Sequence, residues 1–500
     1  MNEIITYFLL FGTLGVFGYI GYRAGSEQEW DSDQYLSARG TQNSVRIALS
    51  LFASGMGVWI LLAPSEVGYY GGFWDVLGYA ISAATPFLLL AYIGPMIREQ
   101  LPTGVTLADY VRMKLGRPMQ LYVGLISILY MFTFLFAEFT AIGRGMEYLS
   151  GMKPLIPMVV VALITTAYTS YGGLPASLKT DRIQAWMILG LVVALLLILF
   201  GADIGQLISD AKAYNPEGYD ASWSYGSITY MDTFASGLAI VIAVTAAEMF
   251  SQGNWQRTWA SEDDKSLKRG ALIASALVLP LVFIMGFLGT VVAGRGSVDD
   301  PSLAFFTLIG DNVLILSALI ILVLALVCSS IDTLQNAIVA SITRDISDGK
   351  MEIKHARIAT IAIIPLAIYL ATGPTIGSFT FDAWSVFGIF LIADLLAAAT
   401  VAPVLLTLWR KVSSKGALLG AFAGIISVII YGIIDPPSGY EGFQQYFMYL
   451  IHPTNDAIPT SLGGMTNLWV FLSAILGSTI VTIIGSYALP DEIKSAVIEE

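Results

Sequence analysis

The sequence has very few of the residues that catalysis or covalent cross-linking requires. It contains one cysteine, Cys328, and two histidines, His355 and His452, which lie far apart in the chain. A single cysteine excludes an internal disulfide framework. No spacing of His, Cys, Asp or Glu fits a metal ligand set or a nucleophile with its base. We therefore expect no enzymatic activity, an intramembrane enzyme included.

Charged residues are also scarce. They make up 12% of the chain, whereas 56% of the residues are hydrophobic and the mean hydropathy is +0.72. A soluble domain carries about 25% charged residues, so this composition predicts a protein that has the lipid bilayer as its solvent. The apolar runs lack strict alternation, which favours helices over a closed barrel. The net charge of −12 argues against a nucleic-acid partner.

Thirteen apolar runs predict thirteen transmembrane helices. They cover approximately residues 4–23, 45–70, 73–97, 120–148, 154–171, 181–201, 231–252, 268–294, 311–342, 356–373, 381–409, 415–434 and 467–489. With these spans, 21 of the 25 Lys and Arg residues fall in the loops of one side. Because cytoplasmic loops keep Lys and Arg, we expect a cell-membrane protein with its N-terminus outside and its C-terminus in the cytoplasm.

Two of these spans are interrupted by small and polar residues. The second contains Ser54, Gly55 and Gly57, and the seventh ends with Ser251 and Gln252, which Gly253 follows directly. Close helix packing through small residues is one explanation. Broken helices at matching places in two halves also mark the binding sites of transporters with inverted repeats. The spacing of five spans favours this second explanation, with helices 2 and 7 discontinuous.

The predicted organisation is a single transmembrane transporter domain over residues 1–500. Two inverted repeats of five spans each would form its centre, and the remaining segments would be peripheral. The first repeat covers 45–201 and the second 231–409, whereas 1–44 forms a first helix and loop and 415–489 forms two C-terminal helices.

Carboxylic acids lie deep within four predicted spans. They are Glu138, Glu248, Asp332 and Asp394. Ionisable residues at membrane depth are costly and mark functional sites. The densest polar cluster surrounds one of them, because Ser329, Ser330 and Thr333 flank Asp332. Oxygen ligands of this kind suit a hard cation such as sodium. On a helix they form two patches, one of Ser329 with Ser330 and one of Asp332 with Thr333.

The substrate is expected to contact the two broken helices and their neighbours. The candidate residues are Ser54, Gly55, Glu138, Glu248, Ser251 and Gln252, with Trp59 and Phe250 as apolar walls. If Glu138 and Glu248 both face the cavity and stay ionised, they favour a cationic or zwitterionic solute, such as an amine or an amino acid. The alternative is that each acid pairs with a basic or amide group of the protein.

Four segments resemble the sodium:solute symporter family. They are Tyr171–Gln184 with its Gly-Gly and Thr-Asp-x-x-Gln pattern, Thr106–Gly116, Trp255–Arg257 and Ser329–Ser330. The resemblance implies the all-α leucine-transporter fold and alternating access. It also implies sodium as the coupling ion and a small-molecule substrate.

The family's sodium site, carried over by motif, gives a specific set of ligands. It implies the carbonyl groups of Ala53, Met56 and Leu326 and the hydroxyl groups of Ser329 and Ser330. Some members have a second cation site, which here would use Asp181, Asp332 and Thr333. Asp332 stands where such members are expected to have serine, so it could carry a proton instead. Gly55 replaces an acid of the proline-transporting branch, which argues against proline.

The predicted function is sodium-coupled symport of a small organic solute into the cell. The alternatives are a proton-coupled symporter, or an uncoupled solute sensor or channel on the same fold. A channel is expected to offer a repeated pore-lining pattern of charges or carbonyl groups, and the sequence has no such pattern.

Overall fold

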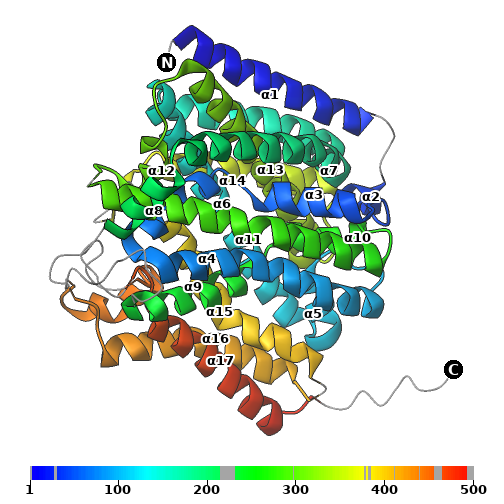
Figure 1. Cartoon of the computed structure of the whole chain (residues 1–500). Helices are drawn as coiled ribbons and strands as arrows, with labels where there is room; N and C mark the ends of the chain where they lie inside the picture. Colours follow the sequence, from blue (N-terminus) through cyan, green and yellow to red (C-terminus); the bar gives the residue numbers. More distant parts are fainter. Residues whose placement is uncertain are drawn as a thin grey trace.

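The apolar runs of the sequence form helices that cross the molecule in roughly parallel and antiparallel directions (Figure 1). The computed structural model describes residues 3–26, 31–213, 231–296, 298–376, 379–380, 385–409, 411–438, 440–454 and 464–491. The α-helices in this part are α1 (Glu3–Ser26), α2 (Ser32–Ser37), α3 (Ser44–Gly55), α4 (Trp59–Gln100), α5 (Leu107–Leu115), α6 (Arg117–Ser150), α7 (Leu155–Ala202), α8 (Ile204–Ala213), α9 (Phe234–Glu248), α10 (Gln252–Ala260), α11 (Asp264–Arg295), α12 (Ala304–Thr307), α13 (Val313–Ser341), α14 (Ile353–Ala371), α15 (Val386–Leu405), α16 (Ser414–Ile434) and α17 (Leu468–Ala488).

Short elements connect some of these helices. Two strands, β1 (Thr375–Ile376) and β2 (Phe379–Thr380), pair in antiparallel register after α14. The 3-10 turns are Met231–Thr233, Pro301–Leu303, Leu406–Leu408 and Phe443–Leu450, and a π-turn, Ile342–Ile346, extends α13. Apart from these two short strands, the regular structure of the described residues is helical, which confirms the predicted all-α membrane fold.

In the described part of the chain, ten helices are long and apolar enough to cross a membrane, or up to eleven if a bent pair counts as one span. The long helices α4 and α7 each contain one residue with non-helical backbone angles, Gly72 (φ 65°) and Gly173 (φ 58°). A helix of 42 residues would be about 63 Å long, twice the hydrocarbon core of a bilayer. Each is therefore two helices that meet at a glycine, which alone adopts a positive φ without strain. The total of thirteen transmembrane helices stays a prediction.

Both predicted helix breaks are present. The first separates α3 from α4 at residues 56–58, and the second separates α9 from α10 at residues 249–251, where the helix axis bends by 56°. Unwinding leaves backbone groups without helical partners. Trp255 satisfies one of them, because its Nε1 donates to the carbonyl oxygen of Met249 at 2.7 Å.

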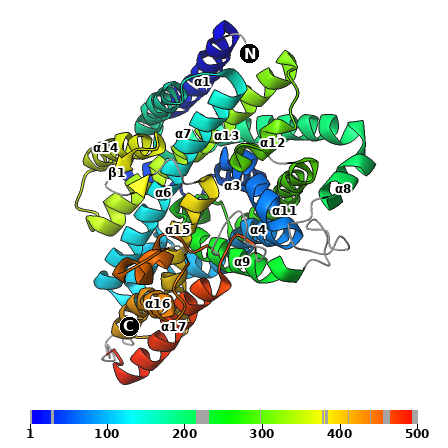
Figure 2. The ribbon, with the colours of Figure 1, turned by 90° about the vertical axis from the view of Figure 1, so that its left-hand side faces the viewer.

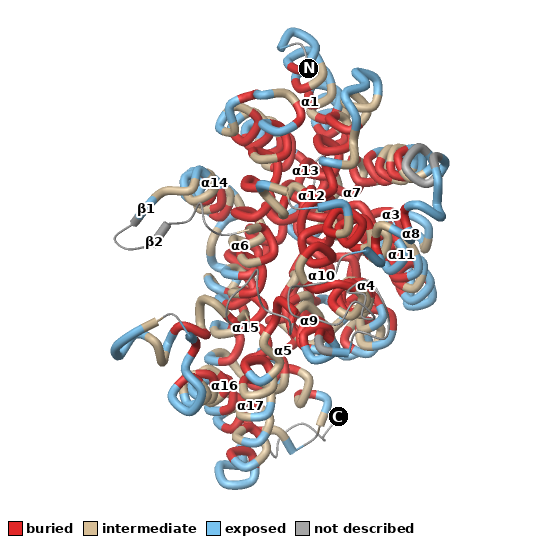
Figure 3. Tube along the Cα trace, turned by 60° about the vertical axis from the view of Figure 1, so that its left-hand side comes forward, coloured by how far each residue is buried: buried red, intermediate tan, exposed pale blue. Residues whose placement is uncertain are grey.

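Buried residues concentrate in the middle of the bundle, where α3, α10 and α13 lie (Figure 3). Helix α1 lies at one edge and α16 and α17 lie at the opposite edge (Figures 1 and 2). These three helices expose large apolar side chains such as Phe8, Ile434 and Ile484. Such side chains suit contact with lipid.

Helices α4 and α11 pack in close backbone contact. A side-chain carbon on Gly68 would lie 1.8 Å from the carbonyl oxygen of Gly286, and one on Gly289 would lie 1.9 Å from that of Ser65. Since helices cannot approach this closely with larger residues, we expect Gly68→Ala to destabilise the protein by about 1–3 kcal/mol. The fall in melting temperature of the purified protein measures this. Gly12→Ala in α1 meets no atom within 4 Å and is the control; equal effects of the two substitutions would contradict the prediction.

Candidate functional site

A small central cavity lies between the two broken helices. Its volume is about 30 Å³, which is room for little more than one water molecule. The lining residues are Gly55, Met56 and Trp59 at the first break, Val244, Ala247 and Glu248 before the second, Tyr79, Ala83 and Phe87 of α4, Phe134 of α6, and Phe390 and Asp394 of α15. The cavity must therefore widen before it can hold an organic solute.

Aromatic rings form most of the cavity wall. Trp59 lies 5.8 Å from Tyr79 and meets Phe390 edge to face at 6.1 Å, measured between ring centroids. Phe390 also stacks on Phe134 at 4.3 Å, and Phe134 contacts Tyr130 at 4.4 Å. Ring faces carry negative electrostatic potential and attract cations. The wall thus favours a positively charged group.

Two carboxyl groups, Glu248 and Asp394, complete the cavity lining, and no Lys, Arg or His is among the lining residues. Glu248 accepts hydrogen bonds from the Tyr130 hydroxyl at 2.6 Å and from Asn254 Nδ2 at 2.9 Å. Asp394 is 1% exposed, and its Oδ2 has no hydrogen-bond partner among the described residues. Buried anionic groups without a counter-charge are costly. A bound cation would supply that counter-charge.

Of the predicted substrate residues, Gly55, Trp59 and Glu248 line this cavity. The other five lie outside its lining. Phe250 is fully buried, and the buried Ser54 Oγ has no hydrogen-bond partner in the described part of the chain. Ser251 lies beside the Tyr130 hydroxyl.

The remaining two polar candidates bind backbone groups. Gln252 donates to the carbonyl oxygen of Val105 at 2.7 Å and accepts from the Leu107 amide at 3.2 Å. It thereby joins α10 to the start of α5. Glu138 accepts from the amide of Val58 at 2.9 Å, so it faces the break between α3 and α4.

Nine of the twelve lining residues were not among the predicted substrate contacts, and five of these nine are aromatic or acidic: Tyr79, Phe87, Phe134, Phe390 and Asp394. Phe390 and Asp394 lie one helical turn apart on α15, so they share a face. This four-residue spacing, together with an acid deep in a predicted span, is the sequence pattern that indicates the α15 part of the cavity wall.

The two serines predicted to bind sodium point toward different carboxyl groups. Ser329 Oγ donates to Asp181 Oδ1 at 2.8 Å. Ser330 Oγ lies 2.7 Å from the point where a side-chain carbon of Gly57 would stand, so it faces the first break. Of the predicted carbonyl ligands, Met56 lies in this break and Ala53 lies in the last turn of α3 before it. Leu326 lies one turn before Ser330 on α13.

The residues predicted for a second cation surround a guanidinium group. Arg257 is fully buried, and its Nη2 donates to Asp181 Oδ2 and Thr333 Oγ1, both at 3.0 Å. Its Nε donates to Ser50 Oγ at 3.1 Å. The charge of Asp181 is therefore matched by an internal cation of the protein.

Asp332, the third residue of that set, is saturated with hydroxyl donors. It accepts from Tyr168 at 2.7 Å, Ser177 at 2.8 Å and Thr180 at 3.1 Å. The three donors all belong to α7, so these bonds join Asp332 of α13 to that helix.

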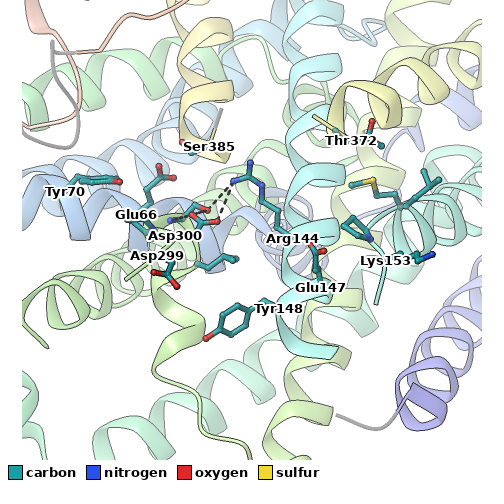
Figure 4. A pocket seen from close by; sticks show the side chains of 17 residues that line it. Glu66, Tyr70, Arg144, Glu147, Tyr148, Lys153, Asp299, Asp300, Thr372 and Ser385 are labelled. Carbon is teal, nitrogen blue, oxygen red and sulfur yellow. Dashed lines mark hydrogen bonds and ion pairs between the residues drawn. The ribbon is translucent and has the colours of Figure 1, made fainter. Parts of the chain in front are cut away.

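A vestibule of about 930 Å³ opens between α4, α6 and the segment before α12, and Figure 4 shows the side chains that line it. The same side of the bundle holds α8 and α12 (Figure 2). The charged lining residues of the vestibule are Glu66, Glu147, Asp299 and Asp300 against Arg144 and Lys153. Glu66 follows Trp59 by seven residues on α4, which is two turns or about 10 Å along the axis. The vestibule floor therefore lies two turns from the central cavity. Sequence analysis missed it because separate chain segments build it.

The opposite side is closed by hydrogen bonds around α5. Trp259 Nε1 donates to the carbonyl oxygen of Leu101 at 2.9 Å, and Thr106 Oγ1 donates to Asp345 Oδ1 at 2.6 Å. Nearby, Arg39 pairs with Asp33 at 2.7 Å and holds the pKa of this carboxyl group below its ordinary value. The structure thus has an open vestibule on one side and a surface closed by hydrogen bonds between side chains and neighbouring segments on the other.

Comparison with known proteins gives one family and several relatives. The Sodium:solute symporter family matches residues 35–424. The spermidine transporter DUR31 of Candida albicans is 29% identical over 462 residues, which cover 90% of this chain and 83% of the relative. The high-affinity proline transporter PutP of Bacillus subtilis is 24% identical and covers 83% of this chain, with 89% of its own length matched.

Solved structures share the fold. A Na⁺-coupled sialic acid symporter in a substrate-bound outward-open state has a TM-score of 0.71 and 16% identity, over 97% of this chain and 98% of its own. MhsT in complex with L-phenylalanine has a TM-score of 0.55 and 17% identity, over 90% of this chain and 99% of its own. These similarities place the chain in the leucine-transporter fold, as the sequence predicted.

The family match covers most of the chain and includes both helix breaks, the Thr-Asp segment and the Ser329–Ser330 pair. Its relatives are transporters rather than enzymes, and the apolar helices fit a multi-pass membrane protein. The chain belongs to the sodium:solute symporter family.

Proposed function

We propose that this protein takes up an organic cation, specifically a linear polyamine, together with sodium. The observation that carries the proposal is the central cavity, whose lining combines aromatic rings with Glu248 and Asp394 and contains no basic residue. A solute with positive charge and an apolar chain would satisfy both features.

The first helix break supports an amine over an amino acid. In transporters with broken helices, the N-terminus of a half-helix binds an anionic group of the substrate. Here the Val58 amide, at the start of α4, already donates to the Glu138 carboxylate at 2.9 Å. A substrate carboxylate would therefore compete with one that the protein supplies. This arrangement argues against proline, as the absence of an acid at Gly55 does.

The vestibule supports a solute with more than one charge. Glu66 lies at its floor, is 4% exposed, and has an Oε2 without a hydrogen-bond partner among the described residues. Since Glu66 lies two helical turns from Trp59, an extended polyamine would reach both carboxyl sites. The relative from Candida albicans, named a spermidine transporter, agrees with this substrate class.

Sodium coupling is proposed from the family and from the oxygen atoms at the first break. The ligands would come from Ala53, Met56, Leu326, Ser329 and Ser330, as the resemblance implies. Uptake would proceed by alternating access from the vestibule, with the N-terminus outside the cell. The vestibule would then face outward, and the hydrogen-bonded surface around α5 would face the cytoplasm.

Competition in proteoliposomes tests the substrate class. Uptake of labelled spermidine would be measured with an excess of putrescine, proline, sialic acid or glucose. We expect putrescine to compete and the other three solutes to have no effect. Transport of proline or a sugar, without any spermidine uptake, would contradict the proposal.

The variant Glu66→Gln tests whether the substrate is a polyamine or a monoamine. The carboxylate would bind a second amino group with a charge-assisted hydrogen bond, so its loss should raise the KM for spermidine about tenfold. The KM for a monoamine that fills only the central cavity should stay unchanged. Glu147→Gln is the control, because Glu147 lines the same vestibule but is exposed. An equal change for both solutes would rule out a polyamine that spans the two sites.

A further inference from the structure

Glu138 lies in the middle of α6, is fully buried, and faces the break between α3 and α4. Its Oε2 accepts the hydrogen bond from the Val58 amide at 2.9 Å. This bond fixes the carboxylate against a part of the chain that has no regular helix. The orientation of the other oxygen, Oε1, is fixed with it.

Oε1 has no hydrogen-bond partner among the described residues, although it is buried. No Lys, Arg or His in this part of the chain forms an ion pair with Glu138. Buried polar atoms in native proteins almost always have partners, and a buried anion without one is strongly disfavoured. Oε1 is therefore a candidate ligand for a cation.

Ser330 supplies a second oxygen atom at the same place. The point where a side-chain carbon on Gly57 would stand lies 1.8 Å from Glu138 Oε1 and 2.7 Å from Ser330 Oγ. The two oxygens are therefore no more than 4.5 Å apart, and they approach the first break this closely only because residue 57 is glycine. Within the described residues, Ser330 Oγ makes no side-chain hydrogen bond, whereas Ser329 Oγ is bonded to Asp181.

We infer that Glu138 is an anionic ligand of the coupling sodium ion, together with Ser330. The inference rests on the proposed sodium coupling and assigns Glu138 to the ion rather than to the substrate. A carboxylate neutralises the charge of the ion at membrane depth, where desolvation makes an unpaired ion costly. Because the other carboxylate oxygen holds Val58, sodium binding would act directly on the helix break beside Trp59 and the substrate cavity.

Equilibrium binding of ²²Na⁺ to the purified protein, in potassium buffer without substrate, tests the inference. Glu138→Gln can keep the bond to Val58 through its amide oxygen, while its amide nitrogen faces the ion. We expect the Kd for sodium to rise at least tenfold in this variant and in Ser330→Ala. Glu147→Gln, which removes an exposed carboxylate of the vestibule, should change the Kd for sodium less than twofold.

Sodium-induced thermal stabilisation of the same variants is the second measurement, and melting in potassium alone shows whether each variant is folded. Folded Glu138→Gln that binds sodium as tightly as the wild type would overturn the inference and leave the proposed transport intact. If Glu138→Gln does not fold, a wild-type sodium Kd in folded Ser330→Ala would overturn the inference instead. A wild-type protein that binds no sodium would refute the proposed coupling itself.

Discussion

Replacing Glu248 by Gln is expected to lower kcat/KM for the amine substrate about 100-fold or more. Glu248 lines the central cavity, and the bonds from Tyr130 and Asn254 fix its carboxylate. Gln has the same shape and can accept one of these bonds, so the loss would come from the missing charge. Removing one partner of a buried charge pair costs about 2–5 kcal/mol. Initial rates of labelled spermidine uptake measure the effect.

Two further variants control for the Glu248 result. Tyr130→Phe removes one hydrogen bond but keeps the carboxylate, so we expect a loss of only about tenfold. Glu147→Gln removes an exposed carboxylate of the vestibule and should change uptake little. Wild-type kcat/KM in Glu248→Gln would show that the substrate does not bind as a cation beside this residue.

Replacing Arg257 by Ala is expected to destabilise the protein by about 3–5 kcal/mol, because it leaves a buried charge without its partner. Arg257 and Asp181 are both fully buried and lie 3.0 Å apart. The guanidinium also binds Ser50 and Thr333, so four helices lose a common contact. The melting temperature of the purified protein should fall steeply, and Arg257→Lys should rescue only part of it because lysine lacks the planar fork of donors.

The pair of Arg295 and Asp210 is the matched control for Arg257. Their side chains are 2.7 Å apart, but Arg295 is 47% exposed. Exposed ion pairs contribute about 0–1 kcal/mol, so Arg295→Ala should scarcely change the melting temperature. The double variant Arg257→Ala with Asp181→Asn removes both charges and should recover part of the stability. Equal melting temperatures for Arg257→Ala and Arg295→Ala would contradict the account of the buried cluster.

Hydropathy and local residue choice were sufficient to predict much of the fold. The apolar runs gave the helices, and the glycines at Gly55, Gly57 and Gly253 gave the two breaks. The predicted spans divide near Gly72 and Gly173, where α4 and α7 have non-helical backbone angles but no intervening loop, and the span count stays a prediction. The orientation of the termini depends on loop charges, and it stays a prediction.

The site was less predictable than the fold, because partners in space leave little trace in sequence. Gly55, Trp59 and Glu248, which line the cavity, were predicted as substrate contacts because they belong to the broken helices. Tyr79, Phe134 and Phe390 are three of many aromatic residues, and only the packing of α4, α6 and α15 brings their rings together.

The serine pair on α13 shows the same limit. Ser329 and Ser330 are adjacent in sequence, but one helical step of about 100° turns them toward different carboxyl groups. Ser329 bonds to Asp181, and Ser330 lies beside Glu138. Both serines were predicted to bind one sodium ion and Glu138 to contact the substrate. These assignments stay predictions, and the hydrogen-bond partners of the side chains are visible only in the folded structure.

Accumulation of labelled spermidine in proteoliposomes, with the membrane potential clamped at zero, tests the central claim most directly. The clamp is necessary because a potential alone would concentrate a cation. The account predicts that an inward sodium gradient raises internal spermidine above the external concentration, and that equal sodium on both sides does not. Accumulation that is independent of the sodium gradient, or that a proton gradient alone produces, would contradict it.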